Sequence, residues 1–359
     1  MGVFGALSVF MALTIAFGLL SSQSAATHAA GVSLTPRFMQ MKSHLSANRF
    51  AGTPLKTWSS SFTYSGKNYP YTMVGTNPSN GSATTTIPTI IVPLKVVFSG
   101  GSSLNGSQKL TLVKNSPLYQ NASYSSGTTQ YADAMQRAEF WKTVSSKAAN
   151  YHVLLGAATV TATVTIKVPA ADGFTEHAGS NNTLIGLADV NWFDGQIQAQ
   201  LSKFNIAPNN FPIFLSNNVY LYQGSSSNCC ILGYHSAVST SQGNQTYAWG
   251  SYISPGLFSA GVQDIDGLSH EVAEWMNDPY VNNTVPNWSV PSEPQYGCSS
   301  VLEVGDPLVG TAFKVKIGTT TYHPQDIAFF SWFARQSPSI GINGRYTYLG
   351  TFTTYSPSC

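Results

Sequence analysis

The chain opens with an apolar run, and only after it do apolar and polar positions begin to alternate. Residues 3–20 carry no charged side chain, and small, mostly polar residues follow them. This order is typical of a secretory signal peptide, so we predict a signal over residues 1–30 and a secreted protein. No Lys or Arg precedes the run, and eighteen apolar residues nearly span a bilayer, so an uncleaved membrane anchor is the alternative.

The stretch after the signal is rich in β-branched and aromatic residues. The run FTYSGKNYPYTMVG predicts a hairpin that turns around Ser65-Gly66, and the run TTTIPTIIVPLKVVF predicts further strand structure. Its prolines favour an edge strand or a bulge over a central strand, because proline cannot donate a hydrogen bond to a sheet ladder. Together with a predicted strand over residues 160–168, these runs define a β-rich N-terminal region, residues 31–180.

Three later stretches place apolar residues at helical spacing. Two of them cover residues 130–146 and 188–204. The third begins near Asp264, where Asp264 or Asp266 can cap the helix. It ends at Asn277-Asp278-Pro279, because proline disfavours helical geometry in the residue before it.

Two strands are predicted between the second and third helices, over residues 211–222 and 246–254. The chain shows no internal repeat and no clear linker. We therefore predict an α+β fold, organised either as a core over residues 181–359 behind the β-rich region or as one continuous domain over residues 31–359.

Composition excludes several classes of protein. Charged residues make up only 9% of the 359 residues and the formal net charge is +2, so no basic stripe exists that could bind nucleic acid. A hydrophobic content of 43% supports a packed core and argues against disorder.

The four cysteines predict two disulfides in an exported chain. Cys229 and Cys230 are adjacent and would form a small, strained ring with each other. We therefore expect each of them to pair with Cys298 or Cys359. A zinc site built from thiolates is the alternative, but the usual paired CxxC spacing is absent.

The sparse charge is concentrated in SHEVAEWMNDP, residues 269–279. His270 and Glu274 are four residues apart, so on a helix both lie on one face and could hold one metal ion. Glu271 lies about 100° further round, where it could reach a water on that ion. This is the logic of the HExxH zinc helix with glutamate in place of the second histidine. The alternative is a solvated ion pair on an exposed helix.

The next acidic cluster, in CSSVLEVGDPLVG, offers the third ligand that a zinc site needs. We expect Glu303 to be that ligand and Asp306 to orient His270, or the two carboxylates to have the reverse roles. One imidazole and two carboxylates neutralise a dication, so Ca²⁺ or Mn²⁺ would compete with Zn²⁺. His235 is a replacement ligand if Glu274 does not bind.

Another expected feature is a donor to the oxyanion that develops during peptide hydrolysis. His235, Tyr280 and Tyr296 are the candidates. Residues 31–56 are a candidate pro-segment, although they hold no cysteine that could block a metal.

The pattern SHEVAEWMNDP, then Trp288, then LEVGDP resembles exported proteins of zinc-metallopeptidase type that carry HExxE and a later E-x-G-D. The resemblance implies a zincin-like core with an active-site helix packed on a mixed sheet. It also implies His270 and Glu274 as ligands, Glu271 as the catalytic carboxylate and Glu303 as the third ligand. More distantly, CCILGYHS and the C-terminal cysteine resemble the phosphate-induced, EXORDIUM-like secreted proteins of plants.

Two functions are therefore expected from different classes. The first is a secreted, monomeric zinc peptidase that cleaves peptide or protein substrates through a metal-bound water and Glu271. The alternative is a non-catalytic secreted or cell-surface binding protein that contacts glycans and holds a structural ion or none.

Overall fold

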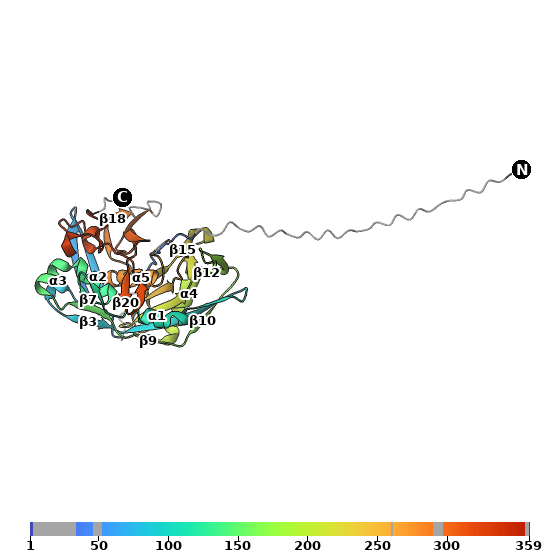
Figure 1. Cartoon of the computed structure of the whole chain (residues 1–359), viewed down its shortest axis with the longest axis horizontal. Helices are drawn as coiled ribbons and strands as arrows, with labels where there is room; N and C mark the ends of the chain where they lie inside the picture. The colour runs from blue at the N-terminus through green and yellow to red at the C-terminus, as the bar shows by residue number, and fades with distance from the viewer. Residues whose placement is uncertain (3–33, 46–51, 260, 290–296, 356–358) are drawn as a thin grey trace. The chain divides into compact units, whose positions relative to one another are not determined.

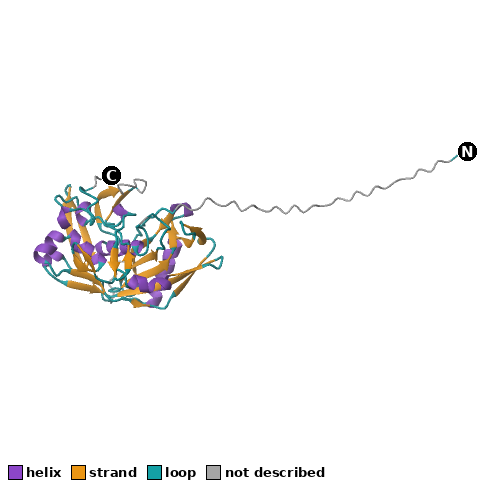
Figure 2. Ribbon diagram, in the orientation of Figure 1, coloured by secondary structure: helices purple, strands orange, loops and turns teal. Residues whose placement is uncertain are grey.

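The computed structural model describes residues 1–2, 34–45, 52–259, 261–289, 297–355 and 359. All but the first two residues of the predicted signal lie outside this part of the chain. Residues 32–359 form one compact unit (Figures 1 and 2). The described residues are 22% helix and 38% strand, so the α+β class is confirmed. Within the described ranges, no helix has the length and apolar character needed to cross a membrane.

The central sheet has the strand order β10-β4-β13-β17-β16, formed by β10 (Val164–Val168), β4 (Thr89–Phe98), β13 (Phe211–Asn217), β17 (Asn244–Tyr252) and β16 (Gly233–Ser239). The first four strands run parallel and β16 is antiparallel, so the sheet is mixed. Two short strands, β5 (Ser103–Asn105) and β9 (Thr159–Val160), also pair with β4. Strands from both sides of residue 180 are therefore neighbours in one sheet.

Both faces of this sheet are covered, which explains why all seven residues of β13 are buried. Phe211 and Leu215 belong to the core on one side, which contains the helix α5 (Asp266–Asn277). Phe214 packs on the other side with α4 (Val190–Phe204). The helix predicted over residues 188–204 is thus confirmed and lies on the sheet face opposite α5.

The predicted edge position of the proline-containing run is wrong. Pro88 separates β3 (Thr84–Ile87) from β4, and β4 is an interior strand flanked by β10 and β13. Pro93 is accommodated because β9 pairs only as far as Ile91 and β10 begins to pair at Leu94. The missing N–H of the proline therefore falls between two short partner strands rather than inside a continuous ladder.

A second sheet has the order β11-β12-β14-β15, formed by β11 (Gly173–Ala178), β12 (Thr183–Asp189), β14 (Val219–Tyr222) and β15 (Cys229–Ile231). Residues 211–222 thus supply two strands, one to each sheet. The hairpin predicted around Ser65-Gly66 is confirmed as β1 (Thr57–Tyr64) and β2 (Lys67–Val74). The remaining strand pairs are β3 with β8 (His152–Leu155), β6 (Ala122–Tyr124) with β7 (Gly127–Thr129), β18 (Thr284–Ser289) with β19 (Cys298–Val301), and β20 (Val315–Ile317) with β21 (Thr320–Tyr322).

The helix predicted over residues 130–146 is present as two shorter helices. They are α2 (Tyr131–Glu139) and α3 (Trp141–Lys147), and they meet at Phe140, whose backbone is not helical. α2 packs against α5. The other helices are α1 (Leu110–Lys114) and α6 (Phe330–Phe333).

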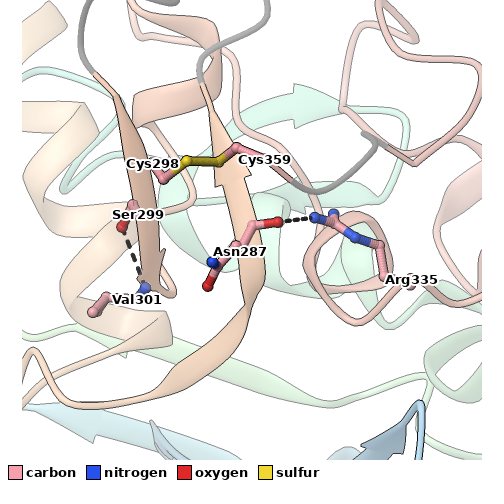
Figure 3. Close-up of a disulfide and its surroundings, with 6 residues drawn as sticks. All are labelled: Asn287, Cys298, Ser299, Val301, Arg335 and Cys359. Carbon is pink, nitrogen blue, oxygen red and sulfur yellow. Dashed lines mark hydrogen bonds between the residues drawn. A yellow bond between two sulfur atoms is a disulfide. The ribbon is translucent and has the colours of Figure 1, made fainter.

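The two disulfides differ from the predicted pairing. Cys298, at the start of β19, is bonded to Cys359 (Figure 3). Cys229 and Cys230 are bonded to each other. The expectation that the adjacent cysteines pair with distant ones is wrong, because the fold brings the C-terminal residue to β19 instead. The thiolate zinc site is excluded, since all four cysteines are oxidised. Two disulfides are consistent with an extracellular protein.

Candidate metal centre

The centre is built on α5, which is buried along its whole length. All twelve of its residues are buried, and it packs against β16, β17, α2 and β2. Trp275 anchors it by stacking on Phe211 of β13, with 3.6 Å between ring centroids. His270 and Glu274 are only 0% and 3% exposed, so a solvated pair on an exposed helix is excluded.

The sequence predicted the C-terminal end of α5 correctly but not the capping of its N-terminal end. The helix ends at Asn277, as Pro279 predicts. Its start is not capped by an aspartate: Ile265 is the N-cap residue and makes no side-chain capping bond. Asp264 instead accepts from the backbone N–H groups of Ile265 and His323, so the predicted capping role is wrong.

Six titratable side chains gather beside this helix. His270, Glu271 and Glu274 come from α5 and His235 from β16, whereas Glu303 and Asp306 come from the loop after β19. Two groups of three, His235 with Glu274 and Glu303, and His270 with Glu271 and Glu274, place their potential ligand atoms within 4.8 Å of one another. Four of the predicted site residues thus fall in these groups and Glu274 is common to both, whereas Asp306 belongs to neither and lies 3.6 Å from His270 Nε2.

Glu274 is held so that its two oxygens have different surroundings. Oε1 accepts from the backbone N–H groups of Gly305 and Asp306 at 3.0 and 3.3 Å. Oε2 lies 3.1 Å from His270 Nε2. A Cβ atom at position 305 would overlap the His270 ring, so glycine is what lets the Gly-Asp-Pro backbone approach this closely. The loop therefore fixes Glu274 while leaving Oε2 directed at His270.

The protonation of His270 follows from its partner Gln325. The Gln325 amide donates from Nε2 to the carbonyl of Gly305, so its Oε1 faces His270 Nδ1 at 3.0 Å and accepts from it. Nε2 then carries the lone pair in the neutral imidazole, on the side where Glu274 and Asp306 lie. Asp306 Oδ1 is 3.6 Å from this Nε2. Asp306 therefore does not orient His270 through Nδ1, as one of the predicted roles required; Gln325 does.

His235 makes two hydrogen bonds of its own. Nε2 lies 3.1 Å from the backbone carbonyl of Asp278, which can only accept, so Nε2 carries a proton. Nδ1 lies 3.2 Å from Glu271 Oε2. Burial alone would lower the pKa of His235, but the hydrogen bond and charge of Glu271 outweigh it and raise the pKa. A protonated His235 donates at both nitrogens and holds Glu271 in place.

Glu303 lies among other buried carboxylates, and neither of its oxygens has a hydrogen-bond partner. Burial, together with the charge of Glu274, raises the pKa of Glu303 well above its ordinary value. Burial alone would lower the pKa of His270, but Glu274 and Glu271 raise it to about 10. Burial by itself disfavours a charged imidazole. The pKa of His270 is nevertheless raised, so the surrounding carboxylates favour a positive charge at this place strongly enough to outweigh the cost of burial.

The unpartnered nitrogen and oxygen atoms of the centre fit a bound cation. Buried polar atoms normally have hydrogen-bond partners. In this centre, His270 Nε2, Glu271 Oε1 and both Glu303 oxygens are buried without one. All of them are acceptors when the imidazole is neutral and the acids are ionised, and a metal ion is the group that satisfies several acceptors at once.

The sequence did not single out Gln325, because its role depends on a loop more than fifty residues away from His270 along the chain. His235 was proposed as a spare ligand or an oxyanion donor, whereas its observed partners are Glu271 and the backbone of Asp278. Tyr280 lines a separate cavity with residues 53–57, and Tyr296 lies outside the described residues.

No family model matches the chain, and neither a curated protein nor a solved structure shows significant similarity to it.

Proposed function

We propose that the protein is a metal-dependent hydrolase of peptide bonds, with zinc held by His270, Glu274 and Asp306. The observation that carries the proposal is the directed pair on α5: Gln325 fixes one ring nitrogen of His270, while the loop fixes one oxygen of Glu274. Two ligands bound at 2.0–2.1 Å in a tetrahedral zinc site lie about 3.3 Å apart. The 3.1 and 3.6 Å that separate His270 Nε2 from Glu274 and Asp306 lie on either side of this value.

Asp306 is the preferred third ligand over Glu303. The Asp306 carboxylate faces His270 Nε2, whereas Glu303 approaches Nε2 of the other histidine, His235, at 4.0 Å. That nitrogen already donates to the carbonyl of Asp278. Glu303 lies close enough to Glu274 for the charge of Glu274 to raise its pKa, and it would stay beside that ligand without binding the ion.

Glu271 is the proposed general base. Its Oε2 is held by His235, and its Oε1 has no hydrogen-bond partner and lies 4.0 Å from His270 Nε2. A bound zinc ion would polarise the scissile carbonyl and acidify the attacking water. Glu271 Oε1 would accept the proton of that water and later deliver it to the leaving amine.

The donor set favours zinc over calcium. Calcium takes six to eight oxygen ligands, and an imidazole is a poor substitute for one of them. His270 is oriented by an amide on its second nitrogen, an arrangement that is usual for histidines bound to zinc. Manganese shares the nitrogen and carboxylate ligands and is the closest competitor.

The wild-type protein and one substitution test the proposal. The wild-type protein should retain zinc after dialysis and hydrolyse a quenched peptide library. Glu271→Gln should keep the zinc but lose at least 100-fold in kcat, the loss expected for a general base. Elemental analysis and fluorescence measure the two properties. A folded wild-type protein without bound transition metal would contradict the proposal.

A non-catalytic protein with a structural ion is the second candidate, because the cluster is closed to solvent. The side chains of His235, His270, Glu271, Glu274 and Glu303 are at most 4% exposed, and Asp306 is 20% exposed. Bound zinc without any hydrolysis, in wild type and in variants that open the site, would favour this function.

A further inference from the structure

The closure of the site has an identifiable source in residues 34–45, which we call the strap. The strap runs along two sheet edges at once. It bridges β15 at Arg37 and Ile231, and β16 at His44 and Val238, in both cases in the parallel sense. β15 and β16 are the last strands of their sheets, so the strap occupies the edges that an extended peptide would use.

Backbone hydrogen bonds hold the strap at both ends. The N–H of Arg37 donates to the carbonyl of Cys230 at 2.8 Å, and the N–H of Leu232 donates to the carbonyl of Arg37 at 3.1 Å. At the far end the N–H of His44 donates to the carbonyl of Ala237 at 2.9 Å. Met41 adds an apolar anchor in the core beneath. The strap is thus attached like an additional strand.

Between these two attachments the strap covers the metal centre. The ring of Phe38 stacks on the imidazole of His270, with 3.4 Å between centroids and 8° between the planes. Phe38 and Asp306 both line a cavity of about 460 Å³ that also reaches β19. One aromatic side chain of the strap therefore lies between the candidate ligand His270 and the adjoining cavity.

We propose that the strap is a cis-acting inhibitory segment, which holds Phe38 over His270 and keeps the centre closed until the strap leaves the edges of β15 and β16. A peptide substrate cannot reach side chains that are at most 4% exposed while the strap is in place. Its attachments are mostly backbone bonds at sheet edges, which are cheaper to open than a packed core element. The effect of the strap on peptide hydrolysis rests on the proposed function, whereas the position of Phe38 over His270 does not.

Three full-length variants test the strap. Phe38→Ala removes the ring over His270. Arg37→Pro removes the N–H donated to Cys230 and leaves Phe38 unchanged. Phe62→Ala is the matched control, since it truncates a half-buried aromatic ring that stacks on Tyr69 in the β1–β2 hairpin.

The first readout is the transfer of zinc from the loaded protein to a chromogenic chelator. Both strap variants should release zinc about tenfold faster than wild type, because they open the centre more often, whereas the control should match wild type. Equal rates in all four proteins would overturn the proposal. Hydrolysis of the peptide library should rise in the same two variants; faster release without any hydrolysis would keep the strap and reject the peptidase.

The second readout does not depend on metal. In metal-free protein, hydroxyl radicals, which react with a histidine ring in either protonation state, should oxidise His270 faster in Phe38→Ala and Arg37→Pro than in wild type or Phe62→Ala, as measured by peptide mass spectrometry. If His270 is protected equally in the strap variants and in wild type, the strap does not cover it. This outcome is informative even if the protein binds no zinc. The two proposals therefore fail on different measurements.

Discussion

Two buried carboxylates that face histidines in this protein have opposite hydrogen-bonding character. Asp133, on α2, is fully buried, and it accepts from the Thr129 hydroxyl, the backbone N–H of Val153 and His152 Nδ1 at 2.6–2.7 Å. Glu303, in the centre beside α5, is equally buried, but neither of its oxygens has a hydrogen-bond partner. Burial is common to both, so burial alone does not identify a site.

The two groups differ in whether the protein supplies hydrogen-bond donors to the carboxylate oxygens. Around Asp133 the protein supplies donors for both oxygens, so this group stabilises the junction of α2 and β8. Around α5 the protein supplies mainly acceptors, which is unfavourable unless protons or a cation compensate them. An excess of buried acceptors over donors is therefore the better signal for a metal centre.

The largest test of this difference exchanges one acid in each group for its amide. Glu274→Gln should weaken zinc binding at least 1,000-fold, on the order of 4 kcal/mol, because a charged ligand is lost. Asp133→Asn should leave zinc affinity unchanged but lower the free energy of unfolding by about 2 kcal/mol, through loss of charge-assisted hydrogen bonds. Calorimetric titration and urea unfolding measure the two effects. Equal zinc loss in both variants would remove the distinction.

A third buried acid, Glu139, is intermediate between the two, because only one of its carboxylate oxygens has a hydrogen-bond partner. Glu139 Oε2 accepts from the N–H of Phe330 at 3.2 Å, whereas Oε1 has no hydrogen-bond partner. Burial raises the pKa of Glu139 from 4.5 to about 8. The folded protein therefore keeps this proton while the unfolded chain releases it, so stability falls as pH rises from about 4.5 towards 8.

Glu139→Gln should remove that dependence. Between roughly pH 5 and pH 7.5 the wild-type protein should lose about 3 kcal/mol that the variant does not lose, at 1.36 kcal/mol for each unit of pKa difference. Urea unfolding at a series of pH values measures it. An unchanged pH profile in the variant would show that Glu139 is ionised in the folded protein, and that an unpartnered oxygen does not imply protonation.

The smallest expected effect concerns two buried glutamines. Gln325 orients His270 and Gln130 binds both backbone groups of Leu155. Gln325→Met should weaken zinc binding about tenfold, since the partner of the ligand's second nitrogen is lost. Gln130→Met should leave zinc affinity unchanged and affect stability alone. If Gln325→Met binds zinc like wild type, the proposed orientation of His270 is wrong.

The local parts of the fold were predictable. The β1–β2 hairpin, α4 and the end of α5 follow from turn residues, periodicity and Pro279, all of which act over a few residues. The interior position of β4 was not predictable. Pro93 is tolerated there because it falls between the pairings of two short strands, β9 and β10, which lie far away in the sequence. The cysteine pairing was mispredicted for the same reason: it depends on where Cys359 lies.

Within the site, the sequence alone determined which side chains are available and placed His270, Glu271 and Glu274 relative to one another, because helical geometry is set by four consecutive residues. Only the tertiary structure decided what surrounds them. The backbone of Gly305 reaches Glu274, Gln325 fixes His270 and Phe38 covers it. These contacts join residues that are 31 to 232 positions apart, and such contacts depend on the packing of the whole chain rather than on any local pattern.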